Sequence, residues 1–151
     1  MNQVEALRLA LAETWAFYFK AHSFHWNVRG PLFPSLHEFF GDIYEDAHGA
    51  VDGLAEQLRA LGQVAPVSLT EIVRGSKAKF LSKIPDCEMM VADLRDTNSL
   101  VVGALGAANA QARAAKNDGL CNYLEGRLDQ HNKWAWQLGA TAEMEEKEDD
   151  E

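Results

Sequence analysis

Apolar side chains recur at steps of three or four residues along most of this chain, and this period is the strongest constraint on its fold. In the first 28 residues the recurring side chains are Val4, Leu7, Leu11, Trp15, Tyr18, His22 and His25. Residues 35 to 61, which contain no proline, repeat the period, as do residues 86 to 116 and 120 to 138. Such steps place side chains on one face of an α-helix, whereas a half-buried strand alternates every second residue. No segment shows that alternation, so we expect an all-α protein with four long helices.

The connections between these segments predict how the helices are arranged. Residues 30 to 34 form a short link, which predicts that the second helix returns antiparallel to the first. Residues 62 to 85 form a much longer link, in which Ser68 and Glu71 have the spacing of a helix capping box. The expected fold is therefore a four-helix bundle with a short extra helix in the crossover between the second and third long helices.

Turn and capping signals locate the last two helices. Asp86 can cap the third helix, and Asn117-Asp118-Gly119 is expected to form the turn before the fourth. The side chains expected to be buried on the fourth helix are Leu120, Leu124, Leu128, His131, Ala135 and Leu138. Residues 143 to 151 include seven acids and one lysine, so we expect a disordered acidic tail after a domain of residues 1–142.

Four side chains of metal-ligand type lie in the first half of the chain: His25, His37, Asp52 and Glu56. Asp52 and Glu56, four residues apart, share one helix face, but His37 lies 15 residues before Asp52, or about 22 Å along a straight helix. Since a ligand atom binds its metal at about 2 Å, one ion cannot reach both ends of this helix. Either the residues are unrelated, or a second, antiparallel copy of the chain brings its acids to these histidines, which would create two equivalent sites.

The same region resembles the Dps family, the mini-ferritins named as DNA-binding proteins from starved cells. The resemblance depends on Phe-His-Trp-Asn-Val-Arg-Gly-Pro at residues 24–31, Leu-His-Glu at residues 36–38 and Val-Asp-Gly-Leu-Ala-Glu at residues 51–56. The gaps of 12, 15 and 4 residues between the four ligand types match the metal-site spacing of that family. The match is strongest over residues 15 to 62 and continues more loosely to about residue 142.

The resemblance implies a ferritin-like bundle, a dodecameric shell and an iron site shared between subunits. It assigns His25 and His37 of one subunit and Asp52 and Glu56 of another as ligands for the oxidation of iron(II) by hydrogen peroxide or dioxygen. The ferric product would be stored inside the shell. It also suggests an electron-donating role for Trp26. Acidic side chains near the start of the fourth helix, namely Asp118, Glu125 and Asp129, are candidates to line an entry pore, although they also suit a solvated surface.

The chain departs from the family pattern four residues after His37. Many members carry an acid there that helps to hold a second iron, whereas this chain has Gly41 followed by Asp42. One residue rotates a helical side chain by about 100°, so Asp42 is not an automatic substitute. A di-iron site would then need water, His22 or His48. A di-iron site inside one bundle is under-supplied with ligands, because Glu45 and His48 form the only Glu-x-x-His pair and face solvent or an interface instead.

Charge and composition narrow the choice of partners and location. The net charge is −9, and the first 19 residues carry Arg8 alone, so DNA binding is not expected despite a small cluster at Lys77, Lys79 and Lys83. Two cysteines, Cys87 and Cys121, suit a reducing compartment, and neither a signal peptide nor a membrane span is visible, so we expect a cytoplasmic protein. The alternatives are a metal-buffering shell that holds zinc at the same ligands, and a DNA-compacting protein.

Overall fold

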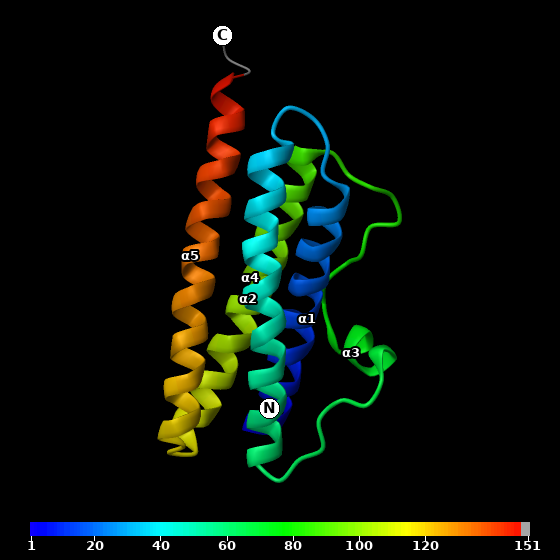
Figure 1. The fold of residues 1–151 in the computed structure, drawn as a ribbon. Helices are drawn as coiled ribbons and strands as arrows, with labels where there is room; N and C mark the ends of the chain where they lie inside the picture. The colour runs from blue at the N-terminus through cyan, green and yellow to red at the C-terminus, as the bar shows by residue number, and fades with distance from the viewer. Residues whose placement is uncertain (149–151) are drawn as a thin grey trace.

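The computed structural model describes the backbone of residues 1–148 and the side chains of residues 1–142. Its helices are α1 (Gln3–Asn27), α2 (Phe33–Ala60), α3 (Leu69–Gly75), α4 (Cys87–Ala114) and α5 (Asp118–Glu148). The described residues contain no strand. Four long helices and the short α3 confirm the all-α bundle, with its extra helix in the crossover (Figure 1).

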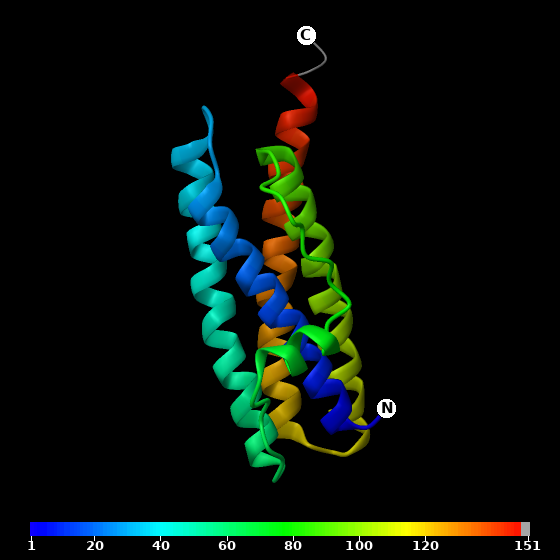
Figure 2. The same cartoon turned by 90° about the vertical axis from the view of Figure 1, so that its right-hand side faces the viewer.

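The crossover determines how the helices pair. In Figure 1, α1 runs upward and α2 returns beside it; the chain then climbs past α3 along the outside of α1, so that α4 runs downward like α2 and α5 runs upward. Figure 2 shows α3 lying across the lower half of α1. α1 packs against α2, α4 and α3, and α4 packs against α5, whereas α2 and α5 touch only sparsely. This one long crossover is the connection of ferritin-like bundles.

The bundle core is apolar and draws on all four long helices. Its largest fully buried side chains include Leu7, Phe17, Phe40, Ile43, Leu94, Leu105 and Leu124. Each contributes about 1.5–3 kcal/mol through burial. On α1 the buried face is formed by Ala6, Leu7, Ala10, Phe17, Ala21 and Phe24.

The stripe that the sequence placed inward on α1 is buried as expected at Leu7 and Leu11, whereas its later members lie beside the buried face. Its members Trp15, Tyr18, His22 and His25 are half-buried, on the side of α1 that faces α2 and solvent. Aromatic and imidazole rings have large apolar areas, which is why periodicity alone grouped them with the core. The fourth helix needs a smaller correction, because Trp134 is buried and the expected Ala135 is exposed.

Side chains and a glycine define several helix ends, among them the expected caps Ser68 and Asp86. Asn2 accepts a hydrogen bond from the Glu5 backbone N–H, Ser68 caps α3 through the N–H of Glu71, and Asp86 caps α4 through the N–H of Met89. Gly62 follows α2 with φ +80°, the left-handed conformation that glycine adopts without strain.

Two boundaries differ from the sequence prediction. α2 begins at Phe33 rather than near Ser35, because Pro34 fits the first helical turn, where its missing N–H is not needed. The turn before α5 begins one residue earlier than predicted, at Lys116, which has φ 56°. The Asn117 side chain caps the helix by accepting a hydrogen bond from the N–H of Leu120. Asp118 and Gly119 therefore belong to the first turn of α5.

The last helix extends beyond the expected domain boundary. α5 continues to Glu148, into the segment of residues 143 to 151 that the sequence predicted as a disordered tail. Residues 149–151 lie outside the described residues, so the boundary at residue 142 stays a prediction. Within the described residues, no helix is both long and apolar enough to cross a membrane.

Candidate metal centre

His25 and His37 meet where α1 ends and α2 begins. Their rings are stacked with centroids 3.8 Å apart and planes inclined by 14°. Phe33 stacks on the other side of His37, with ring centroids 4.9 Å apart. The short link after α1 folds α2 back alongside it, which brings two residues 12 positions apart into contact.

Each histidine ring is hydrogen-bonded to the backbone of the other residue. Nδ1 of His25 lies 2.6 Å from the carbonyl oxygen of His37, and Nδ1 of His37 lies 2.6 Å from the carbonyl oxygen of His25. A carbonyl only accepts, so both Nδ1 atoms carry the proton and donate it. A neutral imidazole protonated at Nδ1 has its lone pair on Nε2, which is the form that binds a metal. The pair thus offers two oriented nitrogen ligands.

Gly41 makes room for this arrangement. It is buried under His25, and a Cβ at this position would lie 3.2 Å from Cε1 and from Nδ1 of the His25 ring. The neighbouring Asp42 is exposed and forms no hydrogen bond or ion pair within the described residues. The histidine pair therefore has no carboxylate from its own helix turn, as the departure from the family pattern at position 41 suggested.

Aromatic rings surround the inner side of the histidine pair. Tyr44 lies edge-on to His25, with ring centroids 5.1 Å apart, and stacks on His22 at 3.8 Å. Trp26 packs on the other face of His22, with ring centroids 4.1 Å apart. The Trp26 side chain is 58% exposed, so much of its apolar surface faces solvent. Burial lowers the pKa of His22, and the charges of His25 and His48 lower it further.

Asp52 and Glu56 lie farther along α2, on a solvent-exposed surface. The Asp52 carboxylate raises the pKa of Glu56, first through a hydrogen bond that favours the protonated acid and then through charge repulsion. A cation placed between the two groups would remove that repulsion. No group of three or more His, Cys, Asp or Glu side chains converges within the described part of one chain, so the histidines and the acids remain separate in the protomer.

Inside the bundle, hydrogen bonds to neighbouring side chains keep His131 from serving as a metal ligand. His131 is fully buried; its Nδ1 donates to the side-chain oxygen of Asn98 at 2.9 Å, and its Nε2 accepts from Arg127 at 3.0 Å. Burial lowers the pKa of His131 to about 3, with a further contribution from the charge of Arg127. Both ring nitrogens are occupied, so this imidazole is not available as a ligand.

The same polar network joins α2 to α5. Arg127 donates two hydrogen bonds, of 2.9 and 2.8 Å, to the carboxylate of Asp46, and the indole N–H of Trp134 donates to that carboxylate at 3.0 Å. Burial alone would raise the pKa of Asp46, but the hydrogen bonds from Arg127 and Trp134 outweigh it and lower the value. Asp46 therefore remains ionised at neutral pH.

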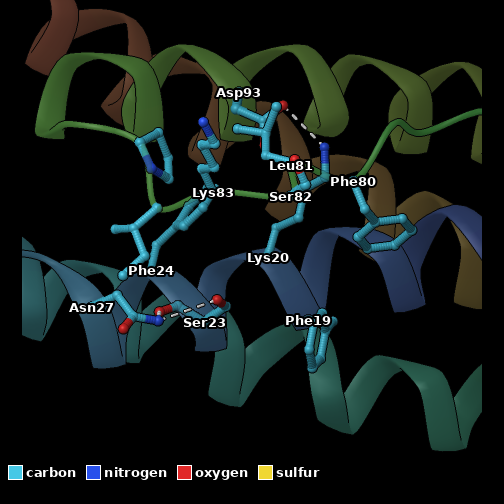
Figure 3. Close-up of a pocket in the computed structure, with 12 residues that line it drawn as sticks. Phe19, Lys20, Ser23, Phe24, Asn27, Phe80, Leu81, Ser82, Lys83 and Asp93 are labelled. Atoms are coloured by element: carbon cyan, nitrogen blue, oxygen red, sulfur yellow. Dashed lines mark hydrogen bonds and ion pairs between the residues drawn. The ribbon is translucent and has the colours of Figure 1, made fainter.

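A cavity of about 180 Å³ lies elsewhere, between α1, the crossover and α4. Figure 3 shows Lys20 and Asp93 pointing toward one another at this cavity; the amino group donates to Asp93 at 2.9 Å, and it also donates to Thr97 at 3.0 Å. None of the candidate metal ligands lines it. The ion pair ties α1 to α4.

The remaining predicted site residues lie on exposed surfaces. Glu45 and His48 are exposed on α2, and His48 packs against the Tyr18 ring with centroids 4.8 Å apart. On α5, Asp118 is exposed, Glu125 pairs with Arg113 at 3.0 Å and Asp129 pairs with Lys133 at 3.2 Å. These ion pairs neutralise part of the negative charge that a cation pore would need.

The sequence did not single out the two tyrosines beside the histidines. Tyr18 was counted as a core residue, although its place four residues before His22 already put both on one face of α1. Tyr44 lies seven residues, or two turns, after His37, so it shares a face with that histidine. Helical spacing from His22 and His37 was the available signal in both cases.

Comparisons with known proteins agree with this architecture. The chain matches the ferritin-like domain family over residues 4–147. A DNA protection during starvation protein of Brevibacillus brevis is 30% identical over 137 residues, which cover 91% of this chain and 92% of the relative. The Dps structure of Staphylococcus aureus aligns with a TM-score of 0.87 and 31% identity, over 93% of this chain and 94% of that one. A Dps protein from Vibrio cholerae O1, described as one of a broad superfamily of ferritin-like diiron-carboxylate proteins, aligns with a TM-score of 0.87 and 25% identity, over 91% and 87% of the two chains. The chain therefore belongs to the Dps family of ferritin-like proteins.

Proposed function

We propose that this protein oxidises iron(II) with hydrogen peroxide or dioxygen and stores the ferric product inside a hollow shell of twelve subunits. The observation that carries the proposal is the reciprocal hydrogen bonding of His25 and His37, which holds both rings with Nε2 free. Histidines that only fill space in a core have no need of this arrangement. It is the arrangement that orients imidazoles toward a metal.

The acids come from a second subunit in this proposal. Asp52 and Glu56 lie on α2, the helix that carries His37, and their repelling carboxylates favour a cation between them. A two-fold axis beside α1 and α2 would set a second α2 antiparallel to the first. Two imidazole nitrogens and two carboxylates would then surround one ion, and symmetry would create the same site twice.

This ligand set suits the oxidation of iron as a substrate. Imidazole binds iron(II) well, whereas hard carboxylate oxygens favour the more highly charged iron(III). The acids of the second subunit therefore lower the cost of losing an electron, and the two tethered imidazoles hold the ion while the oxidant approaches. Zinc accepts the same ligands without redox chemistry, which would make the protein a metal buffer instead.

The relatives support the family-level part of this proposal. The Vibrio cholerae protein is described as a ferritin-like diiron-carboxylate protein, and the Brevibacillus brevis protein by its role in protecting DNA during starvation. Removing iron(II) together with peroxide would protect DNA without contacting it. Direct DNA binding is disfavoured here, because the chain carries a net charge of −9 and phosphate contacts require clustered cations. Action in the cytoplasm is part of the same proposal.

Anaerobic loading with iron(II), followed by hydrogen peroxide, tests the function. The assembled protein should develop ferric absorbance much faster than a protein-free control, and Asp52→Ala should lose tight iron(II) binding while it keeps its helical content. Glu45→Ala is the matched control, because it removes another exposed carboxylate from α2. Iron(II) binding without accelerated oxidation would indicate a metal buffer, and unchanged affinity in Asp52→Ala would refute the ligand assignment.

A further inference from the structure

A chain of packed rings leads away from the histidine pair. From His25 the contacts run to Tyr44 (5.1 Å between ring centroids), to His22 (3.8 Å), and from His22 to Tyr18 (5.6 Å). Tyr18 also lies 6.4 Å from Tyr44 by the same measure. All four residues are half-buried between α1 and α2. Because electron tunnelling weakens steeply with distance, rings packed this closely form a short path to the metal site.

Tyr18 differs from the other two tyrosines in its hydrogen bond. Its hydroxyl lies 3.0 Å from Nδ1 of His22, and it donates when that imidazole is neutral and protonated at Nε2. Tyr123 donates instead to the carbonyl oxygen of Ala50, which cannot take up a proton, and Tyr44 has no hydroxyl hydrogen bond within the described part of the chain. A phenol that loses an electron becomes strongly acidic. A base that is already hydrogen-bonded to the phenol can accept this proton as the electron leaves, which makes the oxidation easier.

The ligand set of the proposed site creates a need for a second electron. Gly41 and the exposed Asp42 leave the histidine pair without a carboxylate of its own, so two imidazoles and the two acids of a second subunit suit one ion. One iron(II) ion supplies one electron. Reducing hydrogen peroxide to two hydroxide ions takes two, and the unassisted one-electron reaction yields iron(III), hydroxide and a hydroxyl radical.

We propose that Tyr18, through its hydrogen bond to His22, supplies the second electron when peroxide oxidises the iron ion; this inference rests on the proposed function. Iron(II) and the phenol each lose one electron, the phenol proton passes to Nδ1 of His22, and the O–O bond of peroxide breaks. The products are iron(III), a neutral tyrosyl radical, an imidazolium ion and two hydroxide ions. A second iron(II) ion then reduces the radical, and the proton returns from His22 to the phenol oxygen.

Electron paramagnetic resonance tests this role in the assembled protein. Anaerobic protein loaded with one iron(II) per site and mixed with peroxide should show an organic radical, and ring-deuterated tyrosine should narrow its spectrum. Tyr18→Phe, which removes only the hydroxyl, should lose that radical and release hydroxyl radical to a spin trap. Tyr123→Phe is the matched control and should behave as the unmodified protein. His22→Gln keeps a hydrogen-bond acceptor but no base, and should also lose the tyrosyl signal.

The outcomes separate this inference from the proposed function. If the unmodified protein oxidises iron and Tyr18→Phe shows the same radical and the same spin-trap yield, the role of Tyr18 is refuted while the function stands. A radical on tryptophan, unaffected by deuterated tyrosine, would refute it equally. If the unmodified protein does not accelerate iron oxidation at all, the proposed function fails first. Iron(II) affinity and helical content, measured for each variant, show that the site is still formed.

Discussion

At the scale of single residues, the histidine pair is held in one arrangement by contacts within the protomer. Each Nδ1 is held by a backbone carbonyl, and the two rings and Phe33 form a stack, so the proposed metal would find few rotamers left to restrict. Gly41 belongs to this arrangement, because the His25 ring occupies the space where a side chain at position 41 would begin. The lack of a side chain at position 41 therefore allows the His25 ring to take its position.

Replacing Gly41 with alanine tests that role. The new Cβ would lie 3.2 Å from two atoms of the His25 ring, so the ring must shift and its bond to the His37 carbonyl must distort. We expect iron(II) affinity to fall by about tenfold, the effect of disturbing a hydrogen bond behind a ligand. Gly103→Ala is the control: nothing lies near it, so it should raise helix stability by about 1 kcal/mol and leave affinity unchanged. Equal iron(II) affinity in both variants would contradict the packing argument.

His131 differs from the histidine pair, because it is buried as a neutral imidazole and both of its ring nitrogens form hydrogen bonds to other side chains. Its pKa of about 3 in the folded protein contrasts with 6.5 in an unfolded chain. Below about pH 6.5 the unfolded chain binds the additional proton, so the free energy of unfolding must fall as the pH falls, until about pH 3. The depressed pKa of Asp46 acts in the same direction at the acid end of this range.

Denaturant unfolding at several pH values measures this effect. Between about pH 6.5 and pH 5 the loss should approach 1.4 kcal/mol per pH unit. His131→Gln should be less stable at neutral pH, because it disrupts the network, but should show a shallower dependence on pH. His48→Gln removes an exposed histidine and should keep the original slope. Parallel curves for the unmodified protein and His131→Gln would assign the acid sensitivity to another group.

At the scale of helices, α2 and α5 are joined mainly by polar contacts. They touch only sparsely, yet Asp46 of α2 accepts hydrogen bonds from Arg127 and Trp134 of α5, and Tyr123 donates to the carbonyl of Ala50. This ion pair is shielded from solvent, since its side chains are 14% (Arg127) and 26% (Asp46) exposed. Directional bonds here fix the position of α5 against the helix that carries three of the four proposed ligands.

Breaking that connection should cost much more than breaking a surface pair. Asp46→Ala leaves the guanidinium of Arg127 and the indole N–H without their partner, and we expect a loss of about 2–4 kcal/mol in the free energy of unfolding. Asp129→Ala removes an ion pair from the same bundle, but its side chains are 59% and 71% exposed, so the loss should be below about 1 kcal/mol. Thermal or denaturant unfolding would show the contrast, and similar losses in both variants would contradict it.

The helices themselves were accessible to sequence reasoning, because apolar period, capping residues and glycine act locally. Ser68 and Asp86 begin their helices as predicted. The errors arose where a local signal had two solutions: Asn117 caps α5 rather than forming a turn with Asp118, and Trp134 rather than Ala135 faces inward. The Asp46–Arg127 pair was not predictable, because it joins residues 81 positions apart and leaves no local pattern.

At the scale of the whole molecule, the sequence indicated four candidate ligands that one protomer does not bring together. His25 and His37 meet as the short link predicts, whereas Asp52 and Glu56 stay remote, as their distance along α2 requires. The separation between the histidines and the acids is the only sign in a single sequence of the second subunit that would bring them together. The chain belongs to the Dps family, and the central proposal is that two subunits share the site.

Mixing two inactive variants tests that sharing most directly. A His25→Ala/His37→Ala protein lacks the nitrogen ligands and an Asp52→Ala/Glu56→Ala protein lacks the acids, so neither alone should bind iron(II) tightly or accelerate its oxidation. After unfolding and co-refolding, with mixed two-fold dimers verified by mass spectrometry, each such dimer would contain one complete site and one site without ligands. The account predicts that tight iron(II) binding returns in proportion to the mixed dimers; verified mixed dimers with no recovery would contradict it.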